Sequence, residues 1–186
     1  RNCSFPMPPA PLVPAALKRQ RRRPLRLPRP PRLLRLFSRS RHLLPAGRPK
    51  AFVIAIADAD TTPEQFCGLE GSSDRVSWPT QLMNAGCAVL VPTLINRDST
   101  HSRHPDIRST NLSHREYVYR MAFELGRHII GFELQRILAG VDAAVVERES
   151  LGQDIPIAVC GYADGGLLAL YAAAIDPRID VCWTSA

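Results

Sequence analysis

The chain has 186 residues, with 24 Lys and Arg against 17 Asp and Glu, and a formal net charge of +7. Its apolar runs all fall short of the roughly 18 residues that a transmembrane helix needs, so we expect no membrane span. The five cysteines include no C-x-x-C pair, which favours buried free thiols over a disulfide framework.

The charge is divided unevenly along the chain. Residues 1–50 contain 14 of the basic residues, 11 of the 17 prolines and no acidic residue. Residues 51–186 contain 10 basic and all 17 acidic residues, a net charge of −7. A Pro- and Arg-rich composition is typical of disorder, whereas 136 residues can bury a core. We therefore predict a disordered tail over residues 1–50 and one domain over residues 51–186.

The tail repeats arginine at every third residue from Arg23 to Arg35. In a polyproline II helix this spacing would form one basic ridge that suits a polyanion. The composition is equally typical of a solvated linker, of a targeting segment, or of GC-rich DNA read outside its true frame. Aromatic residues do not alternate with the arginines, so we do not expect nucleic-acid binding. The origin of the tail, the localisation and the oligomeric state stay open.

The domain begins with two predicted strands separated by two predicted helices. Ala51–Ala57 is a continuous apolar run, typical of a strand covered on both faces. Thr62-Pro63-Glu64-Gln65 is a capping box that begins a helix. Trp78–Ala85 predicts a short helix that ends at Gly86, and Ala88–Val91 predicts the next buried strand.

The same alternation continues to the end of the chain. Ser113-His114-Arg115-Glu116 is a second capping box, and a helical repeat of apolar residues runs from it to Val145, weakened at Gly126 and Gly131. A strand over 155–160, a helix to 175 and a strand over 179–183 follow. This order predicts an α/β fold, a three-layer sandwich with a mostly parallel sheet.

The most informative segment is Gly161-Tyr162-Ala163-Asp164-Gly165-Gly166, between the strand at 155–160 and the following helix. Its strand–turn–helix context and its spacing are those of the nucleophile elbow, G-x-S-x-G. Gly161 and Gly165 lie two residues on either side of the apex, where the turn needs small residues. Gly166 allows the helix to pack closely on the strand. Ala163 stands where the nucleophilic serine would be.

With the segments 52–65, 87–97, 114–142 and 159–180, this elbow resembles the central part of the α/β-hydrolase superfamily, nearest its dienelactone hydrolase and acetyl xylan esterase-like branch. The resemblance implies a partial α/β-hydrolase fold and carboxylic-ester hydrolase ancestry. It places Ala163 at the nucleophile position. It makes the backbone N–H of Asp164 one oxyanion donor and the Ala57-Asp58 loop the source of the second. A small-molecule ester would be the substrate of an active full-length form, and we expect no cofactor.

The triad of this superfamily continues after the elbow, with an acid and then a histidine. The chain has no histidine after His128, and Asp176 and Asp180 follow the elbow too closely to lie beyond two further strands. The sequence opens on Arg1 and stops at Ala186 within a strand-like run. We therefore expect a fragment that is non-catalytic in this form.

Three alternatives stay open. Asp164 could act as the nucleophile, although Tyr162 would then occupy a position that needs a small residue. Asp58-Ala59-Asp60 after a strand resembles the first motif of the haloacid dehalogenase-like phosphatases, which need Mg²⁺ and a distant lysine, and the chain has no lysine after Lys50. The third alternative is a binding or scaffold protein whose tail holds a polyanion.

A zinc site is the remaining possibility that the sequence suggests. His101, His104 and His114 lie close together along the chain. The H-x-x-H pair lies in a Ser-, Arg- and Pro-containing loop that gives it no fixed helical geometry. We interpret these residues as ordinary loop histidines and predict no metal site.

Overall fold

The computed structural model describes residues 40–70, 77–100, 106 and 112–185. The chain divides into two compact units, residues 1–30 and 31–186, and all described residues belong to the second. The predicted disorder of residues 1–39 lies outside the described residues.

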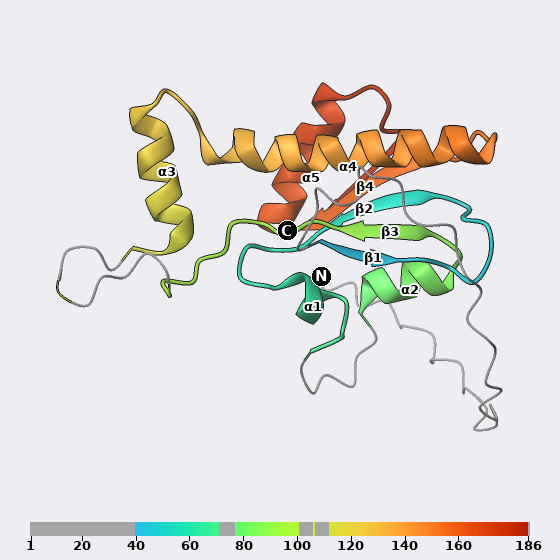
Figure 1. Cartoon of the computed structure of the whole chain (residues 1–186), viewed down its shortest axis with the longest axis horizontal. Helices are drawn as coiled ribbons and strands as arrows, with labels where there is room; N and C mark the ends of the chain where they lie inside the picture. Colours follow the sequence, from blue (N-terminus) through green and yellow to red (C-terminus); the bar gives the residue numbers. More distant parts are fainter. Residues whose placement is uncertain (1–39, 71–76, 101–105, 107–111, 186) are drawn as a thin grey trace, which may run out of the picture. The chain divides into compact units, whose positions relative to one another are not determined.

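Five strands form a single sheet in the order β1-β3-β2-β4-β5 (Figure 1). Strands β2 to β5 run parallel, and β1 pairs antiparallel with β3 at one edge. The predicted α/β fold with a mostly parallel sheet is therefore confirmed. The strands are β1 Arg41–Leu43, β2 Phe52–Ile56, β3 Ala88–Val91, β4 Ile157–Tyr162 and β5 Val181–Ser185.

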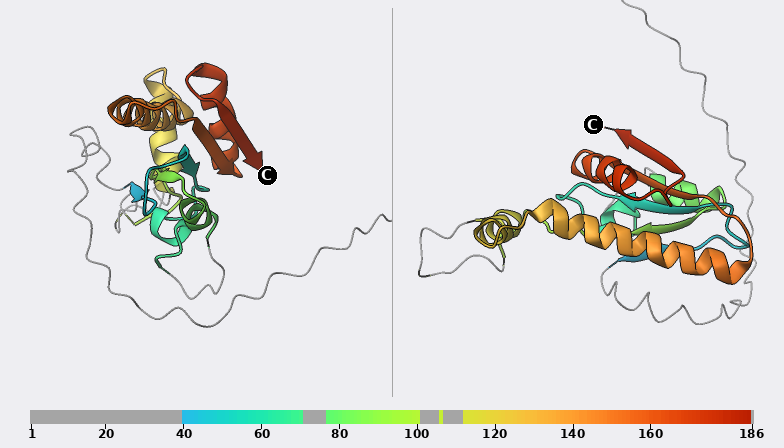
Figure 2. Two further views of the ribbon diagram at one scale, coloured as in Figure 1. Left: turned by 90° about the vertical axis from the view of Figure 1, so that its right-hand side faces the viewer. Right: turned by 90° about the horizontal axis from the view of Figure 1, so that it is seen from above.

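Helices cover both faces of the sheet, which confirms the predicted three layers. Helices α1 and α2 lie on one face, and α4 and α5 lie on the other (Figures 1 and 2). The helices are α1 Pro63–Phe66, α2 Trp78–Asn84, α3 His114–Glu124, α4 Ile129–Leu151 and α5 Asp164–Ile175.

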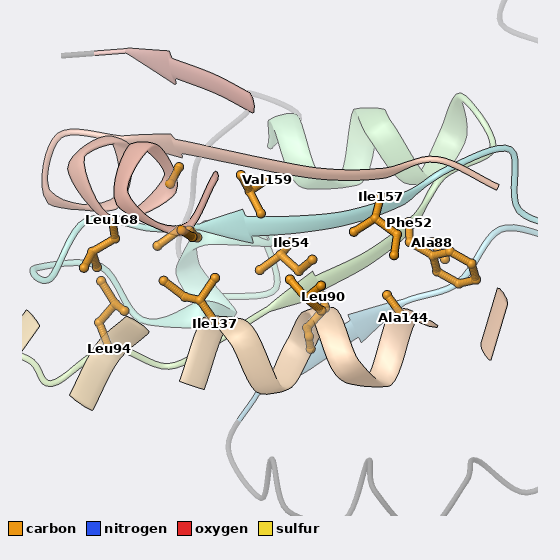
Figure 3. Close-up of a cluster of buried hydrophobic side chains, with 14 of the residues drawn as sticks. Phe52, Ile54, Ala88, Leu90, Leu94, Ile137, Ala144, Ile157, Val159 and Leu168 are labelled. Carbon is orange, nitrogen blue, oxygen red and sulfur yellow. The ribbon is translucent and has the colours of Figure 1, made fainter. Parts of the chain in front are cut away.

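The core is organised around β2, which is buried along its whole length. Successive side chains of a strand point to opposite faces, so an unbroken apolar run serves both layers. Ile54 and Ile56 join the cluster beneath α4 and α5, which includes Ile137 and Leu168 (Figure 3). Val53 and Ala55 join the cluster beneath α1 and α2. Each fully buried isoleucine stabilises the fold by about 1.5–3 kcal/mol.

The predicted helix starts agree with the structure. The Thr62 hydroxyl accepts the N–H of Gln65, and the Gln65 side chain accepts the N–H of Thr62, so the capping box is complete. Ser113 Oγ accepts the N–H of Glu116 at the start of α3. Ser77 caps α2 in the same way. These bonds satisfy N–H groups that a helix cannot pair internally.

The helical repeat that we predicted from 113 to 145 is broken in the structure. Gly126 adopts φ 69°, and the N–H of Arg127 donates to the carbonyl of Ala122, 2.8 Å away. This left-handed termination ends α3, and His128 caps the start of α4. Met121 is 48% exposed and Leu125 is 79% exposed, although both belong to the apolar helical repeat. Periodicity identifies an apolar face but does not say whether another element covers it.

Two further predictions need correction. Arg41–Leu43, which we had placed in the tail, forms the edge strand β1, and its two basic residues had hidden the strand pattern. Cys182, which we expected to be buried, is exposed on β5, whereas Cys67 and Cys160 are buried free thiols. Burial raises the pKa of Cys160 to about 12. None of the helices within the described residues is long and apolar enough to cross a membrane.

Candidate functional site

The carboxyl ends of β2 and β4 define the candidate site. These strands are adjacent, but β2 leads into α1 on one face of the sheet and β4 leads into α5 on the other. Loops that leave neighbouring strands toward opposite faces mark the position where open α/β sheets hold their ligands. Asp58 and Asp60 follow β2, and Ala163 and Asp164 follow β4.

Ala163 lies at the apex between β4 and α5. It adopts φ 52° and ψ −120°, and it is the one non-glycine residue with positive φ among the residues that the structure describes. Such a conformation costs an L-residue about 1–3 kcal/mol, so it persists only where the surrounding structure enforces it. The N–H of Ala163 donates to the carbonyl of Ser185, and its carbonyl accepts from Leu167. The exposed methyl group thus occupies the apex of a strained strand-to-helix turn.

The three glycines around the apex are required by backbone contacts. A Cβ on Gly161 would overlap the carbonyl of Gly165, and one on Gly165 would overlap the carbonyls of Ile56 and Ala57. A Cβ on Gly166 would lie 2.8 Å from the carbonyl oxygen of Ser185. Backbone atoms cannot move aside to admit a Cβ in the way that the end of a flexible side chain can. The first turn of α5 therefore lies directly against the ends of β2, β4 and β5.

The backbone N–H of Asp164 points to a carboxylate. It donates to Asp58 Oδ1 over 3.3 Å, and the Asp58 side chain is about one-quarter exposed. The family resemblance implied that this N–H would face an oxyanion. In the structure, a negatively charged oxygen from the loop after β2 accepts its hydrogen bond.

Arg97, from the loop after β3, joins three carboxylates at this edge of the sheet. Its guanidinium lies 2.9 Å from Asp60 Oδ2, 2.5 Å from Asp164 Oδ2 and 3.7 Å from Asp58 Oδ2. Partial burial, the largest single contribution, lowers the pKa of Arg97. The charges of Asp164, Asp60 and Asp58 together outweigh this contribution and raise the pKa above its ordinary value.

A buried ion pair supports this cluster from behind. Arg115 of α3 donates to both carboxylate oxygens of Glu133 of α4, over 2.6 and 3.1 Å, and Glu133 also accepts the N–H of Ile95. The Glu133 side chain is 1% exposed. Arg115 also lies 3.7 Å from Asp164 Oδ2. The loop after β3, helices α3 and α4 and the elbow are thereby joined by side chains of alternating charge.

Sequence reasoning missed Arg97, Arg115 and Glu133. Glu133 carried a usable signal, because it lies four residues from both Ile129 and Ile137 on the buried stripe of α4. A carboxylate on such a stripe needs a partner. Arg97 carried no comparable signal, since it lies in a polar loop and meets its partners only through the fold.

The Cys160 thiol and the His114 imidazole contact other partners. Cys160 is buried in β4, with its Sγ 3.8 Å from the carbonyl of Ile54. His114 Nδ1 pairs with Asn96 Oδ1 over 2.7 Å. His101 and His104 lie outside the described residues. Within the described part of the chain, no group of three or more His, Cys, Asp or Glu side chains is placed to hold a metal ion.

Comparisons with known proteins find similarity among solved structures. No protein-family model and no curated protein sequence matches the chain. Among solved structures, it is similar to a novel cold-adapted esterase from an Arctic intertidal metagenomic library, with 17% sequence identity and a TM-score of 0.42. The match covers 78% of this chain and 50% of the esterase chain, so the present chain spans about half of that protein's length.

The backbone contacts at the elbow predict opposite effects for one substitution at two glycines. Gly165→Ala should lower the free energy of unfolding by about 3 kcal/mol or more, because its Cβ meets backbone carbonyls. Gly131→Ala in α4, where a Cβ meets nothing within 4 Å, should raise it by up to about 1 kcal/mol. Urea denaturation measures both. Equal effects would show that the elbow is not closely packed.

The strain at the apex predicts that glycine is better tolerated there than alanine. Ala163→Gly should raise the free energy of unfolding by about 1 kcal/mol, because glycine adopts positive φ without a Cβ clash. Ala174→Gly, at an exposed position of α5, should lower it by about 1 kcal/mol. Loss of stability in both variants would contradict the assigned conformation of residue 163.

The buried ion pair predicts a large asymmetry between two glutamates. Glu133→Gln should cost about 2–4 kcal/mol, because it removes the carboxylate that pairs closely with Arg115 in a largely buried position and leaves the Arg115 guanidinium 3.7 Å from Asp164. Glu116→Gln, which weakens an exposed pair with Arg120, should cost under about 0.5 kcal/mol. Chemical denaturation at a fixed salt concentration distinguishes the two, and similar small costs would show that the buried pair is not coupled to folding.

Proposed function

We propose that the chain from β1 onward forms a non-catalytic α/β-hydrolase-type domain of carboxylic-ester hydrolase ancestry, nearest the dienelactone hydrolase and acetyl xylan esterase-like branch. The observation that carries this proposal is the methyl group of Ala163 at a strained apex with φ 52° and ψ −120°. In an active hydrolase this turn presents the nucleophilic oxygen. Here the turn is kept and the oxygen is lost.

The cost of the turn supports inheritance from an enzyme. A plain connection from a strand to a helix has no need of a positive φ at a residue with a Cβ. Strained backbone of this kind clusters at catalytic and ligand-binding positions, where it serves the mechanism. Three glycines that permit the close approach accompany it. The retained geometry is the expected remnant of a nucleophile elbow whose serine has been replaced.

The carboxylate of Asp58 is a second obstacle to ester hydrolysis. An oxyanion hole stabilises negative charge with N–H donors that face the reacting oxygen. The N–H of Asp164 already donates to Asp58 Oδ1 over 3.3 Å. An incoming oxyanion would have to displace this oxygen and would be repelled by its charge. Restoring a hydroxyl at position 163 would leave this obstacle in place.

The contacts of Asp164 argue against its use as a nucleophile. Its Oδ2 lies 2.5 Å from Arg97 and 3.7 Å from Arg115, so the carboxylate is engaged by two cations. It also belongs to the first turn of α5 and not to the apex. For the phosphatase alternative, Asp58 and Asp60 face Arg97. We therefore favour the non-catalytic assignment over either aspartate mechanism.

Hydrolysis of p-nitrophenyl acetate tests this proposal. The wild-type chain, Ala163→Ser and Asp164→Asn should all release p-nitrophenol within about twofold of the rate of an unfolded-protein control, because a nucleophile without a positioned base is weak. Circular dichroism should verify that each variant is folded. Turnover by the wild type that disappears in Asp164→Asn would contradict the proposal and favour an aspartate nucleophile.

A further inference from the structure

Helix α3 exposes most of its apolar side chains. Ala122 is its one buried residue, while its Tyr, Phe and Met side chains are 38% to 66% exposed. Figures 1 and 2 show α3 beyond the end of the sheet, where it meets the start of α4. An exposed apolar helix face of this kind is typical of an interaction surface.

Two neighbouring rows of side chains define this surface, each with a spacing of four residues. Side chains four residues apart lie above one another on a helix. The apolar row is Tyr117, Met121 and Leu125, which are 47%, 48% and 79% exposed. The charged row beside it is Glu116, Arg120 and Glu124, all exposed. Arg120 already pairs with Glu116 within the helix, over 2.6 Å.

The order of charges in this row is self-complementary in one arrangement. When two copies of α3 lie antiparallel about a two-fold axis near Met121, Arg120 of each copy comes beside Glu124 of the other. The same axis brings Tyr117 of one copy against Leu125 of the other and sets the two Met121 side chains together. In a parallel arrangement the two-fold axis would run along the helices and place the two charged rows on opposite sides of the apolar seam, so Arg120 and Glu124 of different copies would form no pair.

We propose that α3 binds α3 of a second copy of this chain, antiparallel, with Met121 at the two-fold axis. The interface is isologous, so each apolar and each charged contact occurs twice. A pair of three-turn helices is a small contact, so we expect a dissociation constant of micromolar order. This proposal does not depend on the hydrolase ancestry.

A lipid surface suits these rows less well than a second copy. Interfacial helices carry Lys and Arg on the polar face, attracted by anionic headgroups. The charged row of α3 has two glutamates and one arginine. The exposed stripe of α5, which includes Leu170, is a second apolar surface, but no charges along that stripe identify what would cover it, so it serves as the control.

Sedimentation velocity at several concentrations of the full chain gives the first test. The wild type should form dimers as concentration rises, and Met121→Glu should weaken association at least tenfold. Leu170→Glu, at a position that is 56% exposed on α5, should leave it within about threefold. A wild type that stays monomeric throughout would overturn the proposal. Association abolished by Leu170→Glu but kept by Met121→Glu would do the same.

Two charge variants give the decisive test. In the Arg120→Glu variant, the new glutamate of one copy faces Glu124 of the other. In the Glu124→Arg variant, the new arginine of one copy faces Arg120 of the other. Each variant alone should therefore associate roughly tenfold more weakly than the wild type. An equimolar mixture should recover near wild-type association, because each variant supplies the charge that the other lacks. A helix that merely loses internal pairs could not be rescued by mixing. A mixture as weak as its components would exclude the antiparallel pairing, and binding to anionic vesicles without dimerisation would favour the lipid surface.

Discussion

The close approach of the first turn of α5 to the ends of β2 and β4 is the constraint on which the site depends. Gly165 lies against the backbone carbonyls of Ile56 and Ala57, and Gly161 lies against Gly165, so no side chain fits between these elements. The chain must then turn sharply from β4 into α5, which forces residue 163 to a positive φ. The same approach brings the N–H of Asp164 within reach of Asp58 after β2. Backbone packing thus fixes the apex and its neighbours together.

The charges around the apex have a coherent structural role. Arg97 links Asp60 to Asp164, and Arg115 links Asp164 to Glu133, so loops after β2 and β3 are tied to α3, α4 and α5. Exposed pairs of this kind are individually weak, whereas the buried Glu133 is costly to leave unpaired. A site arranged in this way holds its own carboxylates in place. It has no nucleophilic side chain at its apex.

The sequence was most informative where backbone geometry demands particular residues. Thr62 and Gln65 predicted a helix start, the run at Ala51–Ala57 predicted the central strand, and the elbow glycines predicted a tight turn beside Ala163. Each signal is local, because a cap, a doubly covered strand and a turn impose their requirements on adjacent residues.

The signals that failed depend on distant partners. The period of Met121 and Leu125 predicted an apolar helical stripe, but no described element covers that face of α3. Arg41 and His42 concealed β1, whose pairing with β3 is set by tertiary structure. Arg97 lies in another loop and is separated from its three carboxylates by 37 to 67 residues along the chain. The position of a residue in a local sequence pattern could not reveal these contacts, because the order of strands in the sheet brings the partners together.

A crystal structure that resolves residue 163 tests the central claim most directly. The account predicts that Ala163 lies between β4 and α5 with φ near 52° and its methyl group at the apex. A negative φ at residue 163, or the side chain of Asp164 at the apex in its place, would contradict both the proposed esterase ancestry and the proposed loss of the nucleophile.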